Sequence, residues 1–427
     1  MSGGPGGKVS VSAGRDRRGV HTPAFRRLTG AWLVSLLGDG VRVAALPLFT
    51  AVNTGSPLAV SAVAVAEVLP WLAVALPAGA LVDRWRPRRV VVVAHAVRAV
   101  ATAALTAAVV TGHAGVTLLV AVAFLLTSAE TFADSASQSL LVGLAGPTEL
   151  ERANGRFVTA ETVGLDLGGP LAASALFLWH PAACFALDTL SFVVAAVLVA
   201  GLPDVVPARE APSAAGRAVL ATLREEVVRG GAHLLRSSPL RVLLTAVAAA
   251  AFGVSAANAV IPLYALRDLA VPAAVVPTLW VVMSLGTLAA ATAAPRMVRA
   301  AGEGRVLVGA LLLLAGGYLV VGMVPRAGAV WGAYAVVGFA AGAWNVLSAT
   351  RRQRLTPGSM MGRVTSSYRL FAWGLMPLGA GVAGPLAVAT SLGTVFVVAG
   401  AVIAVTAVVL ARPLSRPVGV PRTPSGA

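Results

Sequence analysis

The feature that most constrains this chain is a series of long apolar stretches that recurs from one end of the sequence to the other. A bilayer core of about 30 Å is crossed by about 20 apolar residues in an α-helix. The stretches are continuous and lack the alternation of a membrane β-barrel, so we predict an all-α membrane protein with twelve transmembrane helices. The predicted windows are 28–52, 58–81, 90–111, 115–137, 156–178, 182–202, 240–263, 274–295, 304–324, 329–350, 366–389 and 393–411.

Composition excludes a water-soluble fold. Hydrophobic residues make up 57% of the 427 residues, charged residues make up 12%, and the mean hydropathy is +0.84. No soluble core could bury that much apolar surface, so the lipid bilayer is an expected partner. The net charge of +16 would favour nucleic acid in a soluble chain, but here the basic residues lie in short segments between apolar runs. We therefore expect no nucleic-acid partner.

The basic residues also predict the orientation of the chain. Of the 33 Lys and Arg residues, 28 fall on one side of the predicted helices, whereas the opposite side carries only Arg267 and Arg326. Basic segments are retained on the cytoplasmic side during insertion. We expect both termini to be cytoplasmic, in a multi-pass protein of the cell (inner) membrane of a bacterium.

The longest polar interval, residues 203–239, divides the windows six and six. Two such halves with both ends on one side are typical of a pseudo-symmetric transporter whose site lies between the halves. Residues 217–236 could form an amphipathic helix on the inner surface or an ordinary solvated linker helix. The predicted segments are an N-terminal tail at 1–27, a six-helix bundle at 28–202, a cytoplasmic linker at 203–239, a second six-helix bundle at 240–411 and a cytoplasmic tail at 412–427.

A charged turn follows the second window and contains Gly79, Asp83, Arg84, Arg88 and Arg89. The Asp83 carboxylate can accept hydrogen bonds from a neighbouring helix N-terminus and pair with Arg84 or Arg88. We predict that this pairing holds an inner gate closed. The alternative for the arginines is that they only enforce topology.

The fifth window contains a glycine run ending in proline, made of Gly164, Gly168, Gly169 and Pro170. Glycines spaced by four residues let two helix backbones approach closely, and Pro170 bends the helix. We assign these residues to gating, with generic small-residue packing as the alternative.

Acidic residues inside the windows occur only in the first half of the chain. An ionised carboxylate within the bilayer must face a wet cavity, pair with a cation or carry a proton. We therefore predict that proton coupling resides in the first half, whereas the second half shapes the substrate wall. The seven residues are Asp39, Glu67, Glu130, Asp134, Glu161, Asp166 and Asp188.

Three of these carboxylates are our candidates for proton coupling. Asp39 lies three residues before Arg42 on one helix face, so the two can pair, and a purely structural ion pair is the alternative. Glu67 lies deep in the second window without a same-helix partner within four positions. Asp166 is the third candidate because it is also deep.

The substrate wall is predicted from polar and aromatic residues of the later windows together with two of the acids. Trp344, Asn345 and Trp373 could stack on a planar amphiphilic ligand. Glu130 and Glu161 are assigned to the same wall. The alternative for Glu130 is that it pairs with Arg98 or with the basic turns.

The charged turn, residues 79–84 with Arg88 and Arg89, resembles the signature between the second and third spans of the major facilitator superfamily, and the resemblance covers nearly the whole chain. Other segments resemble the enterobactin-exporter and macrolide-efflux branch of that superfamily, which implies a proton-driven exporter of drugs or siderophores. These segments are Leu37-Gly38-Asp39, Thr54-Gly55-Ser56-Pro57, residues 150–154, residues 185–192, Gly362-Arg363-Val364, Arg369 and residues 373–379.

The resemblance also implies roles for single residues. Drug antiporters of the superfamily commonly carry an arginine in the fourth span, which this chain lacks, so Arg98 or Arg42 would take that role in proton coupling. The glycine run is similar to an antiporter motif, from which Asp166 departs. Asp188 occupies a position where the family often has asparagine, and we expect a helix–helix hydrogen bond there.

We expect a secondary active transporter that exports a small amphiphilic drug, antibiotic or siderophore-like molecule by alternating access with proton antiport, acting as a monomer. An importer or facilitator of a small metabolite is the alternative, because one architecture serves both directions. A multi-span membrane enzyme is a further alternative. The sequence has no phosphate-binding loop and no histidine pair at metal-binding spacing, so we expect no catalytic residue, metal or cofactor.

Overall fold

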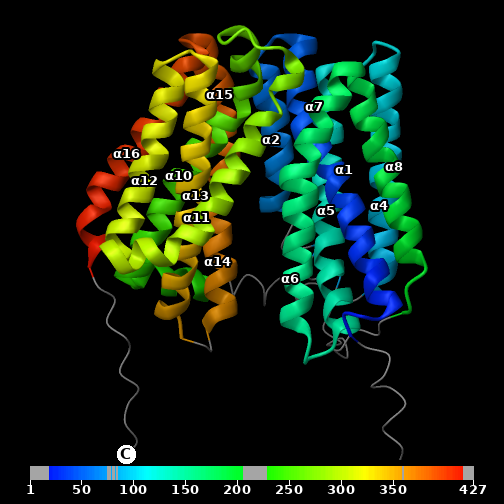
Figure 1. The fold of residues 1–427 in the computed structure, drawn as a ribbon, viewed down its shortest axis with the longest axis horizontal. Helices are drawn as coiled ribbons and strands as arrows, with labels where there is room; N and C mark the ends of the chain where they lie inside the picture. The colour runs from blue at the N-terminus through cyan, green and yellow to red at the C-terminus, as the bar shows by residue number, and fades with distance from the viewer. Residues whose placement is uncertain are drawn as a thin grey trace, which may run out of the picture.

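A computed structural model describes residues 19–74, 78, 82, 85–204, 228–357 and 360–416. Within them the chain forms upright helices in two groups (Figure 1), which we call the first and the second bundle. The first bundle contains α1 (Pro23–Thr54), α2 (Pro57–Ala73), α4 (Pro87–Val110), α5 (Val116–Ala145), α6 (Leu150–Glu161), the π-helix η2 (Thr162–Gly168), α7 (Gly169–Trp179) and α8 (Pro181–Ala200). The second contains α10 (Ser238–Arg267), the 3-10 helix η3 (Ala273–Val275), α11 (Thr278–Ala301), α12 (Glu303–Met323), α13 (Ala327–Leu355), α14 (Met361–Trp373), α15 (Met376–Ala389) and α16 (Leu392–Ser415).

Eleven helical segments of the described chain are long and apolar enough to cross a membrane, and α2 is a shorter apolar helix. Three of the eleven combine consecutive elements: α6, η2 and α7 at 150–179, η3 and α11 at 273–301, and α14 and α15 at 363–389. These segments and α2 match the twelve predicted windows in number and order. The prediction of an all-α membrane protein with twelve transmembrane helices is confirmed.

Short polar residues and proline define where several helices begin. The hydroxyl oxygen of Thr22 accepts a hydrogen bond from the Phe25 amide at 3.3 Å, and Ser56 does the same for Ala59 at the start of α2. Proline occupies the first turn of both helices, where its missing N–H is not needed. The helix α1 ends at Gly55, which has a φ of +56° in the left-handed region that glycine adopts without strain.

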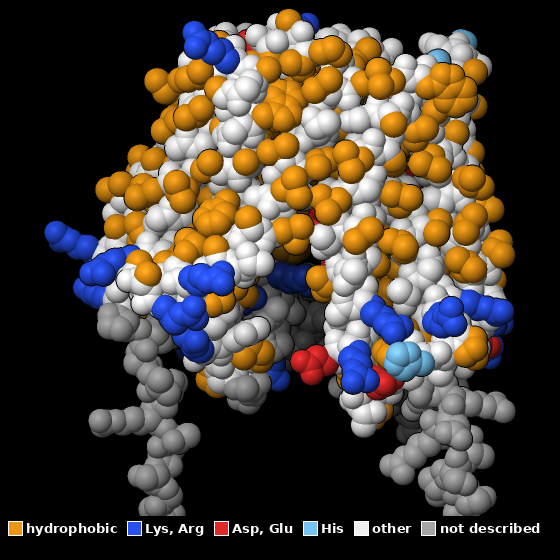
Figure 2. All heavy atoms as spheres, in the orientation of Figure 1, with side chains coloured by type: hydrophobic (Ala, Val, Ile, Leu, Met, Phe, Trp, Pro, Cys, Tyr) orange, Lys and Arg blue, Asp and Glu red, His pale blue; other side chains and the backbone are white. Residues whose placement is uncertain are grey.

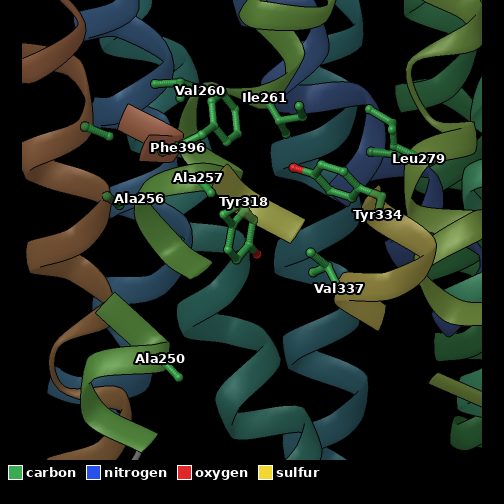
Figure 3. Packing of buried hydrophobic residues seen from close by; sticks show 14 of the residues in the cluster. Ala250, Ala256, Ala257, Val260, Ile261, Leu279, Tyr318, Tyr334, Val337 and Phe396 are labelled. Atoms are coloured by element: carbon green, nitrogen blue, oxygen red, sulfur yellow. The ribbon is translucent and has the colours of Figure 1, made fainter. Parts of the chain in front are cut away.

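The two bundles have apolar interiors and touch each other through a few helices. In the first bundle, α8 packs on α1 and α4, and in the second, α16 packs on α10 and α12. Between the bundles, α2 packs on α15 and α10, while α7 packs on η3 and α11. Figure 3 shows the core of the second bundle, where Tyr318, Tyr334 and Phe396 lie among Ala, Val and Ile side chains.

The two ends of the molecule differ in charge and in shape. The start of α1 and the end of α16 lie at the same end, which we call the terminal end (Figure 1). Figure 2 shows arginine side chains gathered there, and a hollow that opens between the bundles at this end. The opposite end, which we call the far end, is closed by contacts between α2 and α15.

The described part of the interval between the bundles begins at residue 228. Residues 228–236 are helical, and Gly230 lies so close to α14 that a Cβ atom there would be 2.8 Å from the Arg363 carbonyl carbon. This stretch is therefore docked on the second bundle. The rest of the predicted helix at 217–236 lies outside the described residues.

Candidate functional site: a buried ionic cluster in the first bundle

Arg42 lies at the centre of a buried group of carboxylates. Its side chain is 2% exposed and projects from α1. The Arg42 guanidinium lies 3.2 Å from Asp39 and 3.2 Å from Glu130, 3.7 Å from Glu67 and 3.9 Å from Asp188. These carboxylates come from α1, α5, α2 and α8, so one cation holds four helices together.

A second arginine joins the cluster from α4. The Nη2 atom of Arg98 donates hydrogen bonds to Asp39 and, at 3.3 Å, to Glu130. Its guanidinium carbon lies 4.1 Å from the centroid of the Phe192 ring, and His95 stacks on the same ring with 5.8 Å between centroids. We call Asp39, Arg42, Glu67, Arg98, Glu130 and Asp188 the ionic cluster.

Glycines beside Asp39 let the neighbouring helices come close enough to form the cluster. A Cβ atom on Gly38 would lie 2.7 Å from the Asp188 carboxylate, so α8 can approach α1 only because Gly38 has no side chain. A Cβ atom on Gly40 would lie 2.9 Å from the Gly169 Cα atom, so α7 approaches α1 in the same way. Two of the segments that resemble the efflux branch, residues 37–39 and 185–192, therefore lie against each other.

The cluster contains more carboxylates than cations. Guanidinium groups stay protonated in proteins, so the two arginines can balance two of the four carboxylates. A buried charge without a partner is costly, and proton uptake by a carboxylate removes it. Among the described residues, Oε1 of Glu67 and both carboxylate oxygens of Asp188 accept no hydrogen bond. These two carboxylates are the least firmly held members of the cluster.

The predicted pairing of Asp39 with Arg42 is confirmed by the 3.2 Å contact. Glu67, which has no partner on its own helix, reaches Arg42 across the bundle. The expected helix–helix hydrogen bond of Asp188 is wrong: within the described chain its carboxylate accepts none and instead lies near the Arg42 guanidinium. The physical reason is that Asp188 faces a cation shared by several acids, so that charge attraction replaces a single hydrogen bond.

Glu130 was assigned to the substrate wall, but it contacts both arginines of the ionic cluster, in agreement with the alternative of pairing with Arg98. Asp166 does not join: it lies half-buried on η2, and no arginine or lysine among the described residues is within 4.0 Å of it. Glu161, at the end of α6, is also half-buried. Sequence spacing could not reveal which acids converge, because Glu130 and Asp188 reach Arg42 from separate helices.

The predicted aromatic and amide residues of the substrate wall occupy different environments. Asn345 is exposed, and Trp373 is 42% exposed with the Arg369 guanidinium carbon 5.0 Å from its ring centroid. Trp344 is only 3% exposed and belongs to the apolar core. In this conformation the second bundle encloses the large ring, and the assignment of Trp344 to the substrate wall stays a prediction.

Of the predicted gating turn, Gly79, Asp83 and Arg84 lie outside the described residues. Arg88 binds the end of α8: its Nε atom lies 2.9 Å from Asp204, and Nη1 donates to the Leu202 carbonyl oxygen at 2.8 Å. Arg89 is exposed at the start of α4. The described part of this turn therefore ties α4 to α8 within the first bundle.

A similar tie exists in the second bundle and was not predicted. The Arg351 side chain donates to the carbonyl oxygens of Leu414 at 2.6 Å and Arg416 at 2.9 Å. Arg354 pairs with Glu303 at 3.1 Å. These contacts join the terminal ends of α12, α13 and α16. The basic residues that follow residue 350 could have indicated this tie. Basic residues at that place are equally expected to orient the chain in the membrane.

The glycine run packs against α1 of its own bundle. A Cβ atom on Gly164 would lie 3.1 Å from the Leu37 amide nitrogen, and one on Gly168 would lie 3.0 Å from the Leu37 side chain. The run coincides with the π-helix η2, and Pro170 lies in the first turn of α7 that follows. π-Helical turns are often found at functional sites. The gating role of these residues stays a prediction.

The described residues contain no group of three or more His, Cys, Asp or Glu side chains that could hold a metal ion. The site is thus a buried assembly of arginines and carboxylates inside the first bundle. Such an arrangement can exchange protons and can change the attraction between helices as it does so.

Comparison with known proteins agrees with this architecture. The chain is 29% identical over 385 residues to the multidrug efflux pump Tap of Mycolicibacterium fortuitum, covering 86% of this chain and 90% of that protein. The nucleoside transporter NupG has the same fold, with a TM-score of 0.70 at 13% identity over 92% of this chain and 99% of that one. A bacterial homologue of the iron transporter ferroportin, in an inward-facing state, gives a TM-score of 0.70 at 18% identity, with coverage of 92% and 98%.

The model of one protein family, described as the Major Facilitator Superfamily, matches residues 28–379. The match spans both bundles and includes every member of the ionic cluster. The chain therefore belongs to the Major Facilitator Superfamily and is a multi-pass membrane transporter, not an enzyme.

Proposed function

We propose that this transporter exports a small amphiphilic molecule, such as a drug, an antibiotic or a siderophore-like compound, in exchange for protons. The observation that carries the proposal is the ionic cluster, in which two arginines face four carboxylates inside an apolar bundle. Tap, a relative at 29% identity, is a multidrug efflux pump, which supports export. The motifs at residues 37–39 and 185–192 favour the enterobactin-exporter and macrolide-efflux branch.

Protonation of Glu67 provides a physical link between proton entry and movement. Glu67 lies on α2, the helix that packs on α15 and α10 of the second bundle. When Glu67 takes up a proton it loses its attraction to Arg42, and α2 is then held less firmly to α1. Release of the proton restores that attraction. The equilibrium between two arrangements of the bundles thereby depends on the proton.

We further propose that both termini are cytoplasmic and that the protein acts as a monomer in the cell membrane. The concentration of arginine side chains at the terminal end supports this orientation (Figure 2). The hollow then faces the cytoplasm, so the structure corresponds to an inward-open state. We propose that Asn345, Trp373 and Glu161 belong to the substrate wall. We also propose that Asp166 takes part in proton transfer and that the glycine run takes part in gating.

The test is flux of a fluorescent amphiphilic cation or a macrolide in proteoliposomes with an imposed pH gradient. Wild-type protein should accumulate the compound against its gradient, and an uncoupler should abolish accumulation. Glu67→Gln should reduce gradient-driven accumulation at least roughly tenfold while substrate exchange without a gradient continues. Glu151→Gln, which changes an exposed acid on α6, is the matched control and should behave like the wild type.

The alternatives give different results in the same assay. A facilitator would equilibrate the compound at the same rate and to the same final level with or without the gradient. An importer would accumulate the compound only when the gradient drives protons and substrate in the same direction. Either outcome in the wild-type protein would reject proton-driven export.

A further inference from the structure

Ser61 makes an unusual pair of hydrogen bonds between the two bundles. It lies on α2, is 4% exposed, and its hydroxyl donates to the carbonyl oxygen of Ala380 while accepting from the Gly384 amide at 3.1 Å. Both partners belong to α15. The two partners are four residues apart, so the Ser61 hydroxyl contacts the amide and the carbonyl that face each other across one turn of α15.

The local sequence of α15 allows the Ser61 side chain of α2 to approach its backbone this closely. Gly384 has no side chain, and a Cβ atom there would lie 2.7 Å from the Ser61 Cβ atom and 2.8 Å from the Pro57 carbonyl oxygen. Pro385 follows and lacks the amide that would bond to the Gly381 carbonyl. The helix is therefore already one hydrogen bond short beside the place where Ser61 enters.

A second polar contact joins the bundles at the same far end. The Arg267 guanidinium, at the end of α10, donates to the carbonyl oxygen of Gly55 in the turn between α1 and α2. The Ser61 contacts lie one turn into α2 from that turn. Both ties are at the end opposite the hollow (Figure 1), where the bundles are in contact.

We propose that Ser61 is a reversible latch of the far-end gate, a role that rests on the alternating access proposed above. In the observed state the hydroxyl makes both hydrogen bonds to α15. When the bundles separate at the far end, both of these bonds break, and the Ser61 hydroxyl turns back to the carbonyl of Pro57, four residues earlier on its own helix.

This exchange leaves the Ser61 hydroxyl with a partner in either state, but it replaces two hydrogen bonds between helices by one within α2. A buried polar group without any partner in the hydrocarbon region is costly, so a latch that left its hydroxyl unpaired would resist opening. Ser61 avoids that penalty and still favours the closed state. The contact can therefore be specific in the closed state and still release readily.

The test measures distances across both ends of the protein in the absence of substrate and of any proton gradient. Spin labels at His113 and Arg326 report on the far end, and labels at Pro147 and Arg299 report on the terminal end, all four positions being exposed. The buried Cys184 is first replaced by alanine so that only introduced cysteines react. Pulsed dipolar spectroscopy then gives the populations of the two states.

In Ser61→Ala the Gly384 amide can still bond to the Ala380 carbonyl, so the protein should fold. Loss of the latch should lower the ratio of far-end-closed to far-end-open protein roughly two- to tenfold, as expected for one hydrogen bond. Gly384→Ala should lower it further, by roughly tenfold or more, because the added methyl group separates the helices.

Two matched substitutions control for the changes themselves. Ser128→Ala removes a hydroxyl that bonds only within α5, and Gly316→Ala adds a methyl group where no atom lies within 4 Å. Both should keep the wild-type distances. The latch is rejected if Ser61→Ala gives the same distance distributions as Ser128→Ala. That result would not count against proton coupling, because the distances are measured without a proton gradient. Failure of the flux assay would in turn not count against the latch, because the latch is tested by distances alone.

Discussion

The two bundles of this transporter have similar helical architecture but opposite chemistry in their interiors. The first contains the ionic cluster, with Arg42 and Arg98 fully enclosed. The second has Asp268 and Glu303 as its only acids, both at helix ends, and its buried polar groups include the neutral side chains of Tyr318 and Tyr334. In the proposed function, the first bundle responds to protons and the second moves against it as a more uniform body.

The largest effect is expected from removing the central cation of the first bundle. Arg42→Gln leaves four buried carboxylates with one arginine, and loss of one partner of a buried ion pair costs about 3–5 kcal/mol. We expect a large drop in the thermal unfolding temperature in detergent, together with loss of transport. Arg326→Gln, an exposed change in the second bundle, should leave both unchanged. Wild-type stability in Arg42→Gln would show that the cluster does not hold the first bundle together.

An intermediate effect is expected at the terminal-end ties of the two bundles, which differ in burial. Arg351 is buried where it donates to the Leu414 carbonyl, whereas Arg88 remains partly exposed where it pairs with Asp204. Hydrogen bonds from charged groups contribute about 1.5–3 kcal/mol when buried, and exposed ion pairs about 0.2–1 kcal/mol. Arg351→Gln should therefore lower the unfolding temperature more than Arg88→Gln. Equal shifts measured side by side would contradict the role assigned to burial.

The smallest expected effect concerns the interior of the second bundle. The hydroxyl of Tyr334 is buried and has no hydrogen-bond partner among the described residues (Figure 3). Removing an unsatisfied buried hydroxyl is neutral or stabilising by about 1 kcal/mol. Tyr334→Phe should thus keep or slightly raise the unfolding temperature and keep proton-driven flux. A marked loss of flux would show that the second bundle holds a polar function of its own.

Part of the site was predictable because it is local in sequence. The separation of three residues places Asp39 and Arg42 on one face of α1, and their contact follows from helix geometry alone. The presence of acids in the first half only was likewise visible in the residues. Glu130 and Asp188 could not be placed in the cluster, because their distances to Arg42 depend on how α5 and α8 pack against α1.

The surroundings of a side chain depend on how its helix is rotated and packed. Trp344 and Asn345 are neighbours in the sequence, yet the Trp344 ring lies in the apolar core and Asn345 is exposed. The expected hydrogen bond of Asp188 failed because the nearest group is a guanidinium from another helix. The helical spacing of residues predicts which side chains share one face of a helix. It does not predict whether that face packs against lipid, a cavity or another helix.

The amino-acid sequence by itself determined the membrane class and the twelve apolar helices, because the length and hydropathy of each segment decide whether it enters a bilayer. Only the tertiary structure decided that four carboxylates share Arg42 and that the Ser61 hydroxyl bonds to the backbone of α15. The physical reason is the separation in sequence of the residues that interact. Partition into the bilayer depends on neighbouring residues of one helix, whereas ion pairs and interhelical hydrogen bonds depend on positions fixed by packing between distant segments.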